Sequence, residues 1–192
     1  MKLLTTVFLL SVIAGAQTKP STPPTADTQP DYEQTRKWIV KKMGEAGYRH
    51  VVKGVLEKTE VGSYDGLSMD DCNLSFTEIE RTIDSDSDKT TKEIVVVPLS
   101  KVSNIKVSHL VTEILGWNEW NLIIETSPNA VSYRVSEIQH GEEKLTNSHL
   151  GSDTEMRFGT SPESDEDSVK RTKKALDHAV SLCKGTNKNE PF

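Results

Sequence analysis

The chain has 192 residues, of which 34% are hydrophobic and 27% are charged, and its formal net charge is −6. This size and apolar content predict one domain with one modest core. Because the sequence shows no basic patch with interleaved aromatic residues, its negative charge argues against nucleic acid as a partner.

The first 16 residues have the three parts of a secretory signal peptide. Lys2 gives a positive start, an apolar run covers residues 3–14, and Ala14-Gly15-Ala16 places small residues where signal peptidase cleaves. The run is shorter than the roughly 20 residues of a membrane span, and no second run reaches that length. We therefore expect cleavage after Ala16, no membrane span, and a periplasmic or secreted protein. Gln17 follows the cleavage point, so a lipid anchored on an N-terminal cysteine is not expected.

Residues 17–30 are rich in proline and threonine and contain almost no aliphatic side chains. This composition predicts an extended linker, because it cannot bury enough apolar surface to fold. A helix is expected to start at Asp31, whose side chain can cap the first turn, and to stop at Gly47. One face of this helix is expected to meet the core, with Trp38 as its anchor; this face carries Thr35, Trp38, Ile39, Met43 and Ala46.

The pattern from residue 48 to residue 158 changes to alternation of apolar and polar side chains, which is typical of strands. The expected strands are residues 51–56, 64–69, 72–77, 94–97, 105–107, 120–124, 131–135 and 156–158. No helix between them is long enough for parallel crossovers, so we expect an antiparallel meander of about seven or eight strands that forms a curved sheet or a roll.

A long helix should follow Ser161-Pro162, which supplies a cap and a favoured first helical residue. Its apolar stripe ends at Cys183, and Gly185 is the expected stop. The basic residues on its other face are most simply a solvated surface. Residues 31–185 therefore form the predicted α+β domain, and residues 186–192 form a predicted disordered tail.

The two cysteines, Cys72 and Cys183, are both expected on core-facing positions. Export would place them where disulfides persist, so we expect a bridge between the last helix and the sheet. Two buried free thiols are the alternative. Neither cysteine has the helix start or nearby histidine that would mark a catalytic thiol.

The sequence contains no recognisable catalytic, cofactor or metal motif. Asp84, Asp86 and Asp88 have the first spacings of a calcium loop, but Lys89 and Val95 stand where glycine and glutamate are needed. A solvated hairpin loop is therefore the preferred interpretation. The histidines are expected on the surface; they are His50, His109, His140, His149 and His178. Asn73 begins a formal glycosylation sequon, which matters only if the host glycosylates.

Trp117, Trp120 and Tyr133 are the aromatic residues that could form a binding surface. Trp120 alternates with Leu122 and Ile124, which favours core packing for Trp120. Trp117 lies in a turn-like Gly-Trp-Asn-Glu segment, so it is the candidate exposed binding aromatic.

Three segments together resemble a family of uncharacterised exported bacterial proteins. They are Trp38-Ile39 in the first helix, residues 71–78 (DCNLSFTE), and residues 174–183 (KALDHAVSLC). The meander with a final helix also resembles a pleckstrin-homology roll, in which the helix closes an open end of a curved sheet. The extra N-terminal helix departs from that fold, and its lipid-headgroup role is not carried over.

These observations predict an exported, non-catalytic binding or interaction module without a cofactor, whose partner is a protein or a small ligand. A hydrolase with a site assembled from distant residues, such as His140, His149 and nearby acids, is the second hypothesis. An envelope or stress protein that acts through protein contacts is the third.

Overall fold

The computed structural model describes residues 30–52, 58–84, 87–112, 117–139, 141–159 and 166–185. The predicted signal peptide and the residues of the linker before Pro30 lie outside these ranges, as does the predicted tail. The helices are α1 (Tyr32–Met43) and α2 (Glu166–Cys183), with a 3-10 turn η1 (Leu99–Lys101). The strands are β1 (Gly47–Val52), β2 (Lys58–Asp70), β3 (Asn73–Ile83), β4 (Asp88–Pro98), β5 (Val102–Thr112), β6 (Trp117–Thr126), β7 (Val131–Gln139), β8 (Glu142–Gly151) and β9 (Asp153–Phe158).

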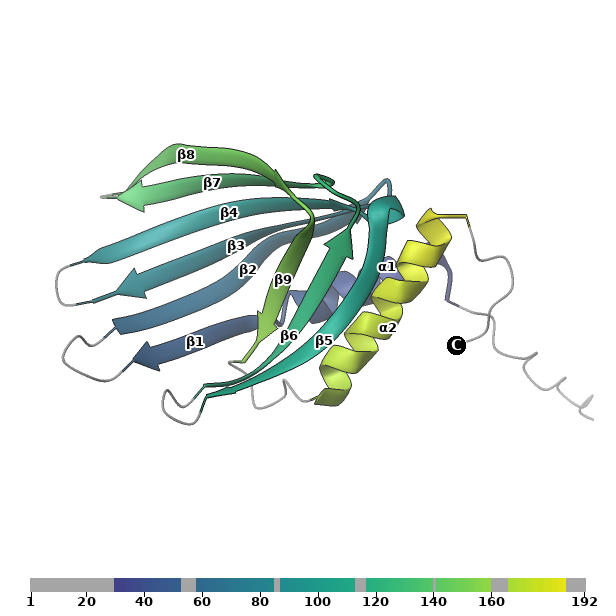
Figure 1. The fold of residues 1–192 in the computed structure, drawn as a ribbon, viewed down its shortest axis with the longest axis horizontal. Helices are drawn as coiled ribbons and strands as arrows, with labels where there is room; N and C mark the ends of the chain where they lie inside the picture. Colours follow the sequence, from purple (N-terminus) through teal and green to yellow (C-terminus); the bar gives the residue numbers. More distant parts are fainter. Residues whose placement is uncertain are drawn as a thin grey trace, which may run out of the picture.

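The nine strands of the described residues form one sheet in the order β5-β6-β9-β1-β2-β3-β4-β7-β8. Every pairing is antiparallel except a short parallel contact between β1 and β9. The α+β class and the antiparallel sheet are confirmed. The sheet stays open, with β5 and β8 at its edges, and it contains more strands than the seven or eight expected, so the predicted roll is wrong (Figure 1).

The strand missing from the prediction is β8, which follows β7 as a hairpin. All its side chains are exposed up to Gly151. A strand that buries neither face has no hydrophobic alternation, and this is why its sequence was interpreted as a polar loop.

Helix α1 begins where predicted, since the Asp31 carboxylate accepts a hydrogen bond from the Gln34 amide at 2.8 Å. The helix ends earlier than predicted, with Gly44 as its cap, and Gly47 begins β1 instead. Its inner side buries Thr35, Ile39 and Met43.

Helix α2 lies beside α1, and it also contacts β5, β6 and η1 (Figure 1). The two helices and the sheet enclose one core, to which α2 contributes Val169, Leu176 and Ala179, all fully buried. The amphipathic stripe of this helix is therefore confirmed. The predicted start at Ser161-Pro162 lies outside the described residues.

Cys72 and Cys183 form the predicted disulfide, which ties the end of α2 to the β2–β3 hairpin. Cys72 was expected within a strand, but it lies in the two-residue turn between β2 and β3. Asp71 and Cys72 both have positive φ, 48° and 60°. A two-residue hairpin turn adopts this conformation at both residues because the turn then matches the right-handed twist of the two strands that it joins. The bridge thus starts from a turn and not from a strand face.

Candidate ligand-binding groove

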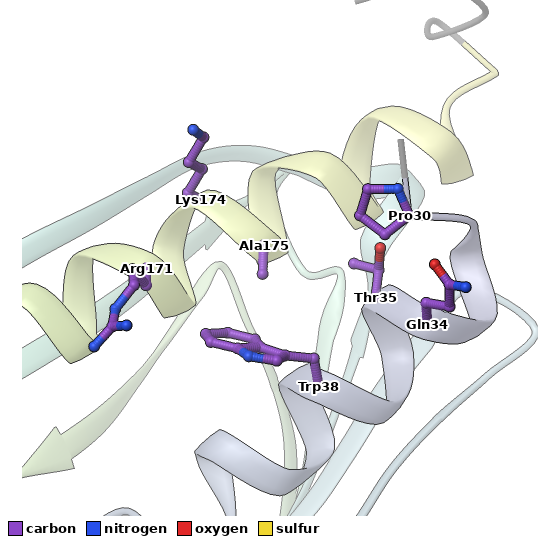
Figure 2. Close-up of a pocket in the computed structure, with 7 residues that line it drawn as sticks. All are labelled: Pro30, Gln34, Thr35, Trp38, Arg171, Lys174 and Ala175. Carbon is purple, nitrogen blue, oxygen red and sulfur yellow. The ribbon is translucent and has the colours of Figure 1, made fainter. Parts of the chain in front are cut away.

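A groove of about 460 Å³ lies between α1 and α2. Its lining residues are Pro30, Gln34, Thr35, Trp38, Arg171, Lys174 and Ala175. Figure 2 shows the Trp38 ring reaching from α1 towards α2, opposite Ala175, with Thr35 and Arg171 towards opposite ends of the groove. Trp38 is half-buried and packs against the core, as expected, but it also provides an aromatic wall for a binding site.

One buried polar group in this groove has no partner. The Thr35 side chain is only 4% exposed, and its hydroxyl makes no hydrogen bond with any described residue. Buried hydroxyls in folded proteins are almost always bonded, because leaving one unpaired costs about 1–3 kcal/mol. An unpaired hydroxyl beside a hollow is therefore a place where a bound molecule can supply the missing partner.

The charge at the groove is positive, although the chain as a whole is negative. Two α2 lysines form ion pairs along their own helix, Lys170 with Glu166 and Lys173 with Asp177. Arg171 and Lys174 line the groove, and none of its described lining residues is acidic. They also line a neighbouring surface hollow of about 440 Å³, together with Asp167 and Lys170. The face of α2 that was expected only to contact solvent thus carries two basic residues, Arg171 and Lys174, that line the groove.

A buried histidine on α2 contacts the segment that leads into α1. His178 is only 6% exposed, and its Nε2 lies 3.2 Å from the Pro30 carbonyl oxygen. His178 was expected on the surface, and this prediction is wrong because Pro30 covers this side of α2. The contact holds the chain just before α1 against α2, next to Thr35.

A second hollow, of about 210 Å³, is polar and lies over the sheet. It is lined by Glu78, Glu80, Thr91, Glu93, Val135 and Arg157. Glu78 and Glu93 are directly opposite each other on β3 and β4. The Tyr48 hydroxyl donates a hydrogen bond to Glu80 at 2.6 Å, and the Arg157 guanidinium lies 4.6 Å from the centre of the Tyr48 ring.

The Glu78 carboxyl in this acidic hollow holds its proton unusually well. Its pKa is raised from 4.5 to about 7, chiefly by burial; Arg157 lowers it, and Glu93 and Glu80 raise it by smaller amounts. Burial also raises the pKa of Glu93. Burial and the hydrogen bond to Glu80 raise the pKa of Tyr48. The Glu78 carboxyl therefore keeps its proton to a higher pH than an exposed carboxyl does.

The residues singled out from the sequence do not come together in the described structure. Trp117 begins β6, but its side chain lies outside the described residues, as does His140. His149 is exposed on β8, and its ring stacks on Tyr133 with centroids 4.7 Å apart. Trp120 packs against the core and stacks on the exposed His109. No described residues support a site built from the histidines.

The predicted hairpin loop around Asp84 and Asp88 is present in its described part. Asp84 accepts hydrogen bonds from Ser87, and Asp88 forms an ion pair with Arg81. Asp86 lies outside the described residues.

Among the described residues, no group of three or more histidine, cysteine or acidic side chains could hold a metal ion. None of the described helices is both long and apolar enough to span a membrane.

Sequence reasoning missed both hollows for the same reason. Thr35 and Trp38 were assigned to a core face, and Glu78, Glu93 and Arg157 had no motif spacing. Each hollow combines residues that are far apart in the chain, and only the helix packing and the strand order bring them together.

Comparisons of the chain with protein-family models, curated proteins and solved structures find no match.

Proposed function

We propose that the chain is an exported, non-catalytic binding module, and that its ligand site is the groove between α1 and α2. The observation that carries this proposal is the buried hydroxyl of Thr35, which has no partner among the described residues and lies beside the apolar wall of Trp38. Ligand sites are concave and mostly apolar, and a few polar groups set the orientation of the bound molecule. The groove has each of these properties.

Export is supported by two features. The predicted signal peptide, residues 1–16, directs the chain out of the cytoplasm, and the Cys72–Cys183 disulfide is a bond that persists in oxidising compartments. The proline-rich linker, residues 17–30, ends at Pro30, which itself lines the groove. The proposed binding site would therefore lie where the linker joins the domain.

The groove is tested with N-phenyl-1-naphthylamine, an uncharged apolar dye whose fluorescence rises in apolar sites. The full chain should bind the dye saturably. Trp38→Ala removes the aromatic wall and should weaken binding about 10-fold or more. Ala175→Phe fills the groove from the facing helix and should abolish binding.

Trp120→Ala is the matched control, because Trp120 is another half-buried tryptophan that packs against the core but does not line the groove. It should bind the dye like the unmodified chain. Equal losses in the Trp38 and Trp120 variants, or no saturable binding at all, would refute the groove as the site.

A hydrolase remains the second candidate, favoured by the raised pKa of Glu78 beside Glu93. A carboxyl that is protonated near neutral pH can act as a general acid, and an ionised neighbour can act as a base. A panel of chromogenic glycosides and esters tests this candidate. Turnover that disappears in Glu78→Gln would favour the hydrolase over the binding module, and no turnover with any substrate would count against it.

A further inference from the structure

We infer that the ligand of the α1–α2 groove is a small aromatic carboxylate with a hydrogen-bonding group at the end opposite its acid. This inference rests on the proposed binding function and names the chemistry that the groove selects. Three side chains carry it, one for each part of such a molecule: Trp38 for the ring, Arg171 for the carboxylate and Thr35 for the far polar group.

Trp38 favours an aromatic body over an aliphatic one. Its ring lies between the two helices, opposite the small side chain of Ala175 (Figure 2). A flat space between an indole face and a methyl group fits a planar ring better than a bulky chain. Aromatic pairs also gain from stacking beyond the apolar area that they bury.

Arg171 favours an acid at one end. Two described arginines pair with carboxylates, Arg36 with Asp70 and Arg81 with Asp88. Arg171 has no carboxylate partner in the part of the chain that the structure describes; its Nε donates a long hydrogen bond, 3.3 Å, to the Asp167 carbonyl oxygen. Its fork of terminal N–H groups matches a carboxylate.

Thr35 favours a polar group at the other end. Its hydroxyl is buried and unpaired among the described residues, and it can donate or accept. Trp38 follows Thr35 by three residues on α1, and Arg171 precedes Ala175 by four on α2. Because Trp38 and Ala175 face each other, Thr35 and Arg171 lie on opposite sides of the Trp38 ring, each about one helical turn away along its own helix. A benzene ring with a short acidic side chain spans that interval.

The test uses calorimetric titration of the full chain with 4-hydroxycinnamate and three analogues, each of which lacks one feature. Cinnamate lacks the hydroxyl, 4-hydroxycinnamyl alcohol lacks the charge, and 3-(4-hydroxycyclohexyl)propenoate lacks the aromatic ring. We expect 4-hydroxycinnamate to bind most tightly. Loss of the hydroxyl should weaken binding about 3- to 10-fold, and loss of the charge about 10-fold or more.

Each ligand change has a matching protein variant. Thr35→Val removes the hydroxyl and should erase the preference for 4-hydroxycinnamate over cinnamate, whereas Thr35→Ser should keep it. Arg171→Gln should erase the preference for the acid over the alcohol. The control is Arg134→Gln, an exposed arginine on β7 that should change neither preference.

Thr35→Val also has a readout that does not depend on any ligand. Because it removes an unpaired buried hydroxyl, it should raise the melting temperature of the free protein while it weakens binding of the hydroxylated ligand. If ligand-free Thr35→Val melts at a lower temperature than the unmodified protein, then the Thr35 hydroxyl has a hydrogen-bond partner in the native state. This result would overturn the role of Thr35 in ligand binding.

The ligand inference and the proposed function fail in different ways. Saturable dye binding that depends on Trp38, with no binding of 4-hydroxycinnamate, would overturn only the ligand class. Absence of both would overturn the site itself. Equal affinities for the acid, its alcohol and the deoxy analogue would also overturn the ligand class.

Discussion

Replacement of Glu78 by glutamine should make the protein more stable at pH 8 and leave its stability nearly unchanged at pH 4.5. The Glu78 carboxyl lies against Glu93 and Arg157 in the acidic hollow over the sheet, and burial raises its pKa to about 7. In the unfolded chain the same carboxyl has its ordinary pKa of about 4.5. The folded state therefore holds this proton more tightly than the unfolded state does.

The direction and size of the effect follow from this difference in pKa. Below pH 4.5 the carboxyl is protonated in both states, and its contribution to stability is fully present. That contribution is lost as the pH rises through about 7, because the unfolded chain releases the proton first. Each pKa unit corresponds to 1.36 kcal/mol, so the loss amounts to about 3 kcal/mol at most. Glutamine resembles the protonated form and does not titrate.

Urea unfolding of the disulfide-bonded protein at pH 4.5, 6 and 8 measures this effect. The advantage of Glu78→Gln over the unmodified chain should grow with pH across this series. Glu142→Gln is the control, since Glu142 is an exposed carboxylate on β8 and its replacement should change stability by less than about 0.5 kcal/mol. A stability difference for Glu78→Gln that is the same at pH 4.5 and pH 8 would refute the raised pKa.

Two other predictions concern packing and covalent closure. Gly62→Ala should lower the free energy of unfolding, measured with urea, by about 3 kcal/mol, because a Cβ at this position would lie 1.9 Å from the Tyr48 ring and displace it. A loss below 0.5 kcal/mol would show that the ring moves aside without cost. Paired Cys72→Ser and Cys183→Ser replacements, which open a link across 111 residues, should cost roughly 4–5 kcal/mol, and a loss under 1 kcal/mol would contradict the loop-entropy argument.

The parts of the fold that could be predicted are those in which one face of an element is apolar. The stripe of α2 and the alternation around Leu74 and Phe76 both follow from burial on one side, and both are confirmed. The strand β8 could not be found in this way because it buries neither face. Cys72 was assigned to a strand, but it lies in the turn just before β3. The apolar pattern does not change between this two-residue turn and the strand, so it could not separate them.

The candidate sites could not be predicted, because each depends on packing between distant segments. His178 looks like a surface residue on a helical projection, and only the position of Pro30 buries it. Thr35 looks like an ordinary core-facing threonine, and its missing hydrogen bond becomes visible only in three dimensions. Similarly, Glu78 meets Arg157 through strands that are far apart in sequence.

The disulfide from the β2–β3 turn to the end of α2 encloses every element from β3 to α2 in one covalent ring. A protease that cuts the backbone once within this ring opens it but releases no fragment. Two cuts are needed before a piece of the sheet can leave. A single nick in a loop between β3 and α2 would then leave the strands, both helices and the groove between them on one connected molecule.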